Sequence, residues 1–218
     1  MQKVVGLVGL RGSGKDTAAQ FLVALGWRRI AFADALYLEV ADAFGVTVEF
    51  LQRRETKETP QPELALANCK DQMFVGRFLA YEDQKAFDAG ATLDPAEQLL
   101  KPRSPREILQ VWGTEYRREM YSDDYWRAQV AKVVKANPDV NYVITDVRFP
   151  DEGLLVEGEL KGQLGRIRRP GLGGADDKAL LHASEVAMLD YPIALEFINE
   201  EGEEGLANFR AAVVRAYH

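Results

Sequence analysis

A glycine-rich segment near the amino terminus constrains the fold of this chain more than any other feature. Residues 4–8 are apolar apart from one glycine, and they lead directly into Gly9-Leu10-Arg11-Gly12-Ser13-Gly14-Lys15. Glycines permit tight turns in which successive backbone N–H groups point at an anion, and the helix expected to follow adds its positive amino-terminal end. Strand, glycine loop and helix in this order are typical of a loop that binds the phosphates of a nucleoside triphosphate. Residues 9–15 are called the phosphate loop below.

Three residues at the end of this segment carry its predicted chemistry. Lys15 is expected to reach the β- and γ-phosphates of ATP. Asp16 stands where such loops usually have serine or threonine as a Mg²⁺ ligand, and a carboxylate also suits this hard cation. Thr17 either supplies the hydroxyl group or is an ordinary early helix residue. The residues predicted to bind ATP are Arg11, Gly12, Ser13, Gly14, Lys15, Asp16 and Thr17.

The bulk properties of the chain exclude several classes of protein. Its 218 residues suit one α/β domain with an insertion, and a net charge of −7 argues against binding a nucleic-acid polymer. Cys69 is the single cysteine, which excludes an internal disulfide and fits a reducing compartment. No apolar run has the length of a membrane span, and the first one lacks the features of a signal peptide. We therefore expect a cytoplasmic protein without a membrane or nucleic-acid partner.

Two aspartates follow predicted strands. Asp34 comes after a strand expected over residues 28–33 and heads a helix expected over 35–44, and Asp146 follows a buried strand over 141–145. Ligands of open α/β sheets gather at the carboxyl ends of the strands, where phosphate-loop enzymes often hold the acidic group behind Mg²⁺. Asp146 is therefore a candidate metal ligand. Asp34 is a candidate for the reaction centre or an N-cap of its helix, and the two roles are compatible.

Arginines near the carboxyl-terminal third are candidate phosphate contacts. Arg148 lies two residues after Asp146, and its alternative role is an ion pair with Asp146 or Asp151. Arg169 ends a run of arginines that precedes a glycine-rich stretch. A small lid over residues 166–181 that closes over the transferring phosphates fits this pattern, and a solvated basic loop is the alternative. The lone histidine that follows, His182, is favoured as a structural residue.

The middle of the chain, residues 46–136, is predicted to form a mostly helical insertion beside the core, and an oligomer contact is an equal alternative for residues 46–104. A helix start is clear at Ser104-Pro105, where an N-cap precedes a proline. Trp112, Tyr116 and Trp126 are able to stack on a base, although packing in the core is the favoured role for each. The segment after Trp112 either continues or breaks the preceding helix.

Several motifs then point to one family. They are GLRGSGKDT, FAD, SPREILQVWGTEYRRE, ITDVRFPDEG, RRPG and HASE, in this order. Together they resemble the deoxynucleoside monophosphate kinases of tailed bacteriophages. The pairing of PRE-x-LQ-x-x-GTE-x-x-R with TDVRFP-x-E is the most specific part of the resemblance, and residues 61–101 contribute least. Asp151 stands where the family more often has asparagine.

The resemblance implies a nucleoside monophosphate kinase-like fold, in which helices flank a five-stranded parallel sheet. It implies Mg²⁺-dependent transfer of the γ-phosphoryl group of ATP to a deoxynucleoside 5′-monophosphate, for viral DNA precursor synthesis in the host cell cytoplasm. It also implies a homodimer. By position, the catalytic residues would be Lys15, Asp34, Asp146, Arg148 and Arg169. The acceptor-binding residues would be Asp34, Arg106, Arg117 and Arg118, and the metal ligands Asp16 and Asp146.

Two rival functions stay open at this point. A dephospho-coenzyme A or phosphomevalonate kinase would share the GKD loop, although the PRE…GTE…R segment favours a nucleotide acceptor. A regulatory module that binds nucleotide without turnover would need no second phosphate site, and the arginines far from the phosphate loop argue against it.

Overall fold

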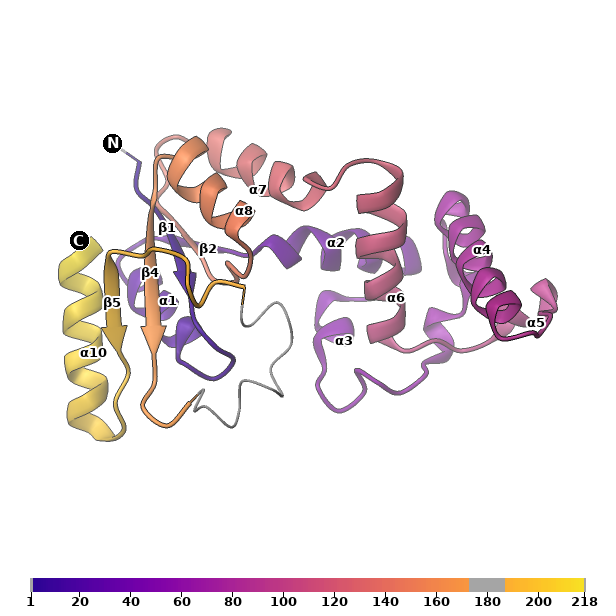
Figure 1. Cartoon of the computed structure of the whole chain (residues 1–218), viewed down its shortest axis with the longest axis horizontal. Helices are drawn as coiled ribbons and strands as arrows, with labels where there is room; N and C mark the ends of the chain where they lie inside the picture. The colour runs from indigo at the N-terminus through magenta and orange to yellow at the C-terminus, as the bar shows by residue number, and fades with distance from the viewer. Residues whose placement is uncertain (1, 173–186, 218) are drawn as a thin grey trace. The chain divides into compact units, whose positions relative to one another are not determined.

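In a computed structural model, the described residues are 2–172 and 187–217 (Figure 1). The chain forms two compact units. The first unit combines residues 1–32 with residues 127–218, and the second consists of residues 33–126. Among the described residues, no helix is both long and apolar enough to span a membrane.

A five-stranded sheet is the centre of the first unit. Its order is β2-β3-β1-β4-β5, and every neighbouring pair of strands is parallel. The strands are β1 Val4–Val8, β2 Arg28–Ile30, β3 Tyr142–Ile144, β4 Gln163–Arg168 and β5 Leu195–Ile198. The parallel sheet of five strands that the sequence predicted is thereby confirmed, with β1 at its centre.

Helices cover both faces of this sheet, because side chains along a strand alternate between the faces. Val5 and Leu7 of β1 pack with α1 and α10, which lie together on one face (Figure 1). Val4 and Val8 pack on the opposite face, against α7 and the π-helical turn η4 that continues α8. These elements are α1 Lys15–Val23, α10 Gly202–Tyr217, α7 Tyr125–Lys135, α8 Pro150–Leu154 and η4 Leu155–Glu159.

The start of helix α2 differs from the expectation. The strand before it ends at Ile30, and α2 spans Phe32–Phe44, so that Asp34 lies within the first helical turn. Asp34 is therefore not the N-cap that the sequence suggested. The backbone N–H of Phe32 instead donates to Oδ1 of Asp146 at 2.7 Å. A carboxylate more than a hundred positions away caps the helix, and such a partner cannot be found from local spacing.

Helices and short 3₁₀ turns build the second unit around an aromatic core. The ring of Phe74 lies 4.4 Å from that of Trp112 and 5.5 Å from that of Tyr116, measured between centroids. Trp112, Tyr116 and Trp126 are all at least 95% buried, which confirms the favoured packing role. The remaining elements are α3 Val48–Gln52, η1 Pro62–Leu64, η2 Leu66–Asn68, α4 Gln72–Asp88, α5 Pro95–Leu100, α6 Pro105–Val111 and η3 Trp112–Arg118.

Two of these helix starts are set by their own sequence. Oδ1 of Asp94 accepts the N–H of Ala96 at the start of α5, and Oγ of Ser104 accepts the N–H of Glu107 at the start of α6. Past its last residue α6 neither stops nor continues regularly. It widens into the π-helix η3 over Trp112–Arg118. Such widened turns are rare and occur often at functional sites.

Packing around the central strand predicts the effect of one substitution. A Cβ atom on Gly6 of β1 would lie 2.7 Å from Cδ2 of Leu164 and 2.9 Å from Cγ2 of Val147. We expect Gly6→Ala to overpack this face and to lower the free energy of unfolding by about 1–3 kcal/mol in urea denaturation. The control is Gly76→Ala in α4, where nothing lies within 4 Å. There alanine should be neutral or should stabilise by up to about 1 kcal/mol. Equal stability of the two variants would contradict the packing described for β1.

Candidate active site at the carboxyl edge of the sheet

The parallel strands of the first unit all end at one edge of the sheet, and the phosphate loop lies at that edge. Gly9, Gly12 and Gly14 have φ angles of 154°, 81° and 106°, which residues other than glycine rarely adopt. The loop ends at Lys15, the first residue of α1, so its backbone leads into a helix amino terminus. This is the geometry that the sequence indicated for binding phosphate.

Neighbouring strands fix the position of the loop from both sides. A Cβ atom on Gly9 would lie 2.5 Å from the carbonyl oxygen of Ile167 in β4, and one on Gly14 would lie 2.3 Å from Nδ2 of Asn199. That same Nδ2 donates to the carbonyl oxygen of Ser13 at 2.9 Å. Asn199 is thus a candidate site residue that the sequence reasoning missed. Its signal is its place directly after a strand, β5, and a place after a strand also marked Asp146.

The charged residues of the loop occupy different environments. Nζ of Lys15 donates to the carbonyl oxygens of Gly9 and Leu10, at 2.6 and 2.9 Å, so the lysine folds back over its own loop. Asp16 is exposed in the first turn of α1, where a negative charge interacts favourably with the helix dipole. Arg11 is exposed at the tip of the loop. Ser13 is 1% exposed, and its Oγ has no hydrogen-bond partner among the described residues.

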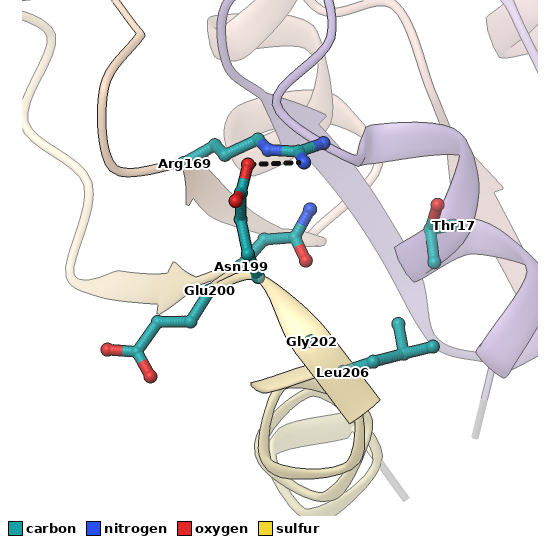
Figure 2. A pocket seen from close by; sticks show the side chains of 7 residues that line it. Thr17, Arg169, Asn199, Glu200, Gly202 and Leu206 are labelled. Atoms are coloured by element: carbon teal, nitrogen blue, oxygen red, sulfur yellow. Dashed lines mark hydrogen bonds and ion pairs between the residues drawn. The ribbon is translucent and has the colours of Figure 1, made fainter. Parts of the chain in front are cut away.

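A pocket of about 500 Å³ that is largely open to solvent lies beside the start of α1, just after the phosphate loop. Figure 2 shows the residues that line it, which belong to the start of α1, to the segment after β4, to the turn between β5 and α10, and to α10 itself. Arg169 forms an ion pair with Glu201 across this space, with Nη2 3.2 Å from Oε1. The lining residues are Thr17, Arg169, Asn199, Glu200, Glu201, Gly202 and Leu206. The structure thereby places two predicted site residues, Thr17 and Arg169, at one cavity.

The segment after β3 is held by a buried carboxylate. Glu152 is 7% exposed, and its Oε2 accepts the backbone N–H groups of Arg148 and Phe149, at 2.7 and 3.1 Å. Burial raises the pKa of Glu152 from 4.5 to about 7, and the nearby negative charges of Asp146 and Asp151 act in the same direction. The two backbone hydrogen bonds act against this shift. Glu152 was not singled out from the sequence, although it closes the TDVRFP-x-E motif.

The candidate Arg148 has an exposed side chain next to this clamp. Its alternative role was an ion pair with Asp151, but Asp151 pairs with Arg127 of α7. Asp146, the other possible partner, caps α2 as described above. Of the predicted lid, residues 173–181 lie outside the described residues, as does His182.

The candidate acceptor residues Asp34, Arg106, Arg117 and Arg118 all belong to the second unit. Arg106 is exposed and pairs with Glu58, with Nε 2.8 Å from Oε1. Arg117 is largely buried and pairs with Glu39, with Nε 2.7 Å from Oε2. Arg118 is half-buried, and its Nε has no hydrogen-bond partner among the described residues.

A glycine loop and its lysine, placed at the carboxyl end of the central strand of a parallel sheet, define this chain as a P-loop protein. Comparison with curated proteins then shows its family. The chain is 32% identical over 183 residues to the deoxynucleoside-5′-monophosphate kinase of Escherichia phage T5, and the match covers 72% of each chain. The chain belongs to the deoxynucleoside monophosphate kinase family, and it is a phosphotransferase.

Further comparisons give the following matches. A protein of Acanthamoeba polyphaga mimivirus, provisionally named a deoxynucleotide monophosphate kinase, is 30% identical over 199 residues, covering 85% of this chain and 81% of the relative. Among solved structures, dephospho-CoA kinase from Campylobacter jejuni aligns with a TM-score of 0.49 and 15% identity, covering 99% of this chain and 96% of that one. A scan against protein-family models found no match.

The buried carboxylate predicts how stability depends on pH. Between about pH 4.5 and 7 the folded state keeps the Glu152 proton that the unfolded chain has lost. The contribution of Glu152 to stability therefore falls as pH rises through this window, by a total on the order of 3 kcal/mol. In Glu152→Gln the neutral side chain can still accept the N–H of Arg148, and this part of the pH dependence should vanish. Urea denaturation at several pH values measures it. Parallel stability curves for variant and wild type would refute the assignment.

Proposed function

We propose that the protein transfers the γ-phosphoryl group of ATP to a deoxynucleoside 5′-monophosphate. The observation that carries this proposal is the phosphate loop at the carboxyl edge of the sheet, in a chain of this kinase family. The acceptor is itself a phosphate oxyanion, so the reaction needs no strong base. It needs the two substrates to be positioned and their negative charges to be offset.

ATP would bind at the first unit. The ammonium group of Lys15 now donates hydrogen bonds to the carbonyl oxygens of Gly9 and Leu10 in the loop. When ATP binds, it would donate to oxygens of the β- and γ-phosphates instead, because these phosphates bind to the same loop. The backbone N–H groups of residues 11–17 and the helix end of α1 would bind the same oxygens. The open pocket of about 500 Å³ beside the start of α1 has the volume to receive a nucleoside. We assign it to the adenosine part of ATP.

Mg²⁺ would be held by Asp16 and Asp146. Both are carboxylates, the oxygen donors that this hard cation prefers. Mg²⁺ in phosphoryl-transfer sites is usually bound by one or two carboxylates, substrate phosphates and waters rather than by a cage of protein ligands. Consistent with this, the described residues contain no cluster of three or more acidic, histidine or cysteine side chains able to hold a metal. The ion would offset charge on the transferring group.

The acceptor nucleotide would bind through residues of the second unit. Arg106, Arg117 and Arg118 supply positive charge in a chain whose net charge is −7, and Asp34 would contact the same ligand. Arg148 and Arg169 would neutralise negative charge on the transferring group, because phosphoryl transfer needs such cations. A homodimer located in the cytoplasm, with no nucleic-acid partner, completes the proposal.

Replacing the loop lysine tests the donor site. We expect Lys15→Met to lower the rate of phosphoryl transfer by at least about 10²-fold, because a preorganised charge on the transferring group is lost. The circular dichroism spectrum should be unchanged. The matched control is Lys135→Met, which removes an exposed lysine of the same unit that pairs with Glu159. This control should keep full activity. Full activity in Lys15→Met would overturn the P-loop assignment.

A panel of acceptors tests the substrate class. We expect ADP release, in a coupled assay with ATP and Mg²⁺, for one or more of the four common deoxynucleoside monophosphates. The matching ribonucleotides and dephospho-coenzyme A belong in the same panel. Turnover of dephospho-coenzyme A alone would replace the proposed acceptor with that rival. ATP binding without turnover of any acceptor would support a regulatory module instead.

A further inference from the structure

The carboxylate of Glu39, in the second unit, accepts three hydrogen bonds from side chains. Oε1 of Glu39 accepts the hydroxyl of Tyr125 at 2.6 Å. Its Oε2 accepts Nε1–H of Trp112 at 2.9 Å and Nε–H of Arg117 at 2.7 Å. These four residues are called the Glu39 cluster below. They join helix α2 to η3 and to the first residue of α7, and all of them lie within the second unit.

The π-helix explains how two of the three donors reach the same oxygen. Trp112 and Arg117 are five positions apart, and in an ordinary α-helix such residues point about 140° away from each other. In a π-helix the repeat of the hydrogen bonds is five residues, so side chains with this spacing lie one turn apart on nearly the same face. The irregular segment Trp112–Arg118 therefore aims both donors at Glu39.

Aromatic rings enclose the guanidinium group that this arrangement holds. Cζ of Arg117 lies 5.4, 4.4, 5.1 and 5.3 Å from the ring centroids of Trp112, Tyr116, Tyr121 and Tyr125. These distances are within the range of cation–π attraction. Burial by itself would lower the pKa of Arg117, but the hydrogen bond and the charge of Glu39 outweigh it and raise the pKa. Arg117 is thus a rigid cation whose side chain is 14% exposed.

The two Nη groups of Arg117, on the edge opposite Nε, are the part of this cation that suits a ligand. Within the described residues, the bond from Nε to Glu39 is the only hydrogen bond that the Arg117 side chain donates. The Nη groups form a planar fork that matches two oxygens of a phosphate group. An exposed arginine loses side-chain entropy when it orders around a ligand, whereas Arg117 is ordered beforehand. A fixed cation with such an edge is a preformed phosphate-binding group.

We propose that Glu39 is a positioning residue for the acceptor nucleotide, which holds the Nε edge of Arg117 so that the Nη edge binds the acceptor phosphate. This inference rests on the proposed function and names a residue that the family resemblance did not supply. Glu39 itself touches no substrate in this scheme. Tyr125 supports it from the opposite oxygen, and burial raises the pKa of this tyrosine to about 12, so its hydroxyl keeps the proton that it donates.

Steady-state kinetics with separate titration of the two substrates tests the proposal. We expect Glu39→Gln to raise KM for the deoxynucleoside monophosphate about 10-fold, because a neutral amide oxygen holds the Arg117 guanidinium less tightly than a carboxylate does. KM for ATP should be unchanged. The matched control is Glu49→Gln, which removes an exposed carboxylate of the same unit and should leave both constants as they are. Equal losses for both substrates would show a structural role only and would overturn the proposal.

A double-mutant cycle measures whether Glu39 and Arg117 act together on the monophosphate KM. General damage to the fold would not produce such coupling between the two residues. Arg117→Lys should raise KM for the monophosphate to a similar extent, and the Glu39→Gln/Arg117→Lys double variant should be little worse than either single variant. Additive effects would contradict action through Arg117. If Glu39→Gln does not fold, Tyr125→Phe keeps the ion pair and should still raise the same KM a few-fold, with KM for ATP unchanged. An unchanged monophosphate KM in Tyr125→Phe would then overturn the proposal.

The outcome for the wild-type protein separates this inference from the proposed function. If the wild type turns over no monophosphate, the proposed function has failed, and calorimetry with a deoxynucleoside monophosphate alone then tests the site. Binding by the wild type that weakens at least 10-fold in Glu39→Gln would support the positioning role without the reaction. Equal binding by both proteins, or none by either, would overturn the role of Glu39. Turnover with an unaltered monophosphate KM in Glu39→Gln overturns the inference alone.

Discussion

Two glycines of the phosphate loop lie so close to β4 and to the residue after β5 that a Cβ atom on either glycine would overlap a neighbouring atom. Gly9 contacts the backbone of Ile167, and Gly14 contacts the amide of Asn199 that bonds to Ser13. The loop is therefore held by the sheet and not only by its own sequence. Because all five strands are parallel, the segments that follow β1, β3, β4 and β5 all begin at the carboxyl edge of the sheet. Ligands of open α/β sheets bind at this edge, next to the phosphate loop.

The second unit uses a different principle to place positive charge in an acidic protein. Arg117 is neutralised and fixed by Glu39, and aromatic rings surround it, so one cation is ordered inside a hydrophobic unit. Arg106 pairs with Glu58 at the surface, where the solvent screens the interaction. A protein that brings together two polyanions gains from cations that are ordered before the substrates arrive. The widened helix at Trp112–Arg118 is the local irregularity that makes this order possible.

The parts of the fold that were predicted correctly depend on neighbours in the sequence. The phosphate loop, the helix start at Ser104 and the apolar central strand all follow from residues within a few positions of one another. The role of Asp34 as a helix cap was wrong for the opposite reason. The competing cap, Asp146, lies 114 positions after Phe32, whose backbone N–H it accepts, and only the pairing of β2 with β3 brings it to the start of α2.

The sequence alone determined the class of the protein, because a glycine loop, its lysine and the flanking strand and helix are encoded in one continuous stretch. The family resemblance also implied a parallel sheet, and core packing was the favoured role of Trp112 and Tyr116; the structure confirms both. Only the tertiary structure decided which side chains support these groups. Asn199 reaches Ser13 across 186 positions and Arg117 reaches Glu39 across 78, and no local pattern records such contacts. They exist because parallel strands and packed helices bring distant segments together, and that geometry appears only when the chain is folded.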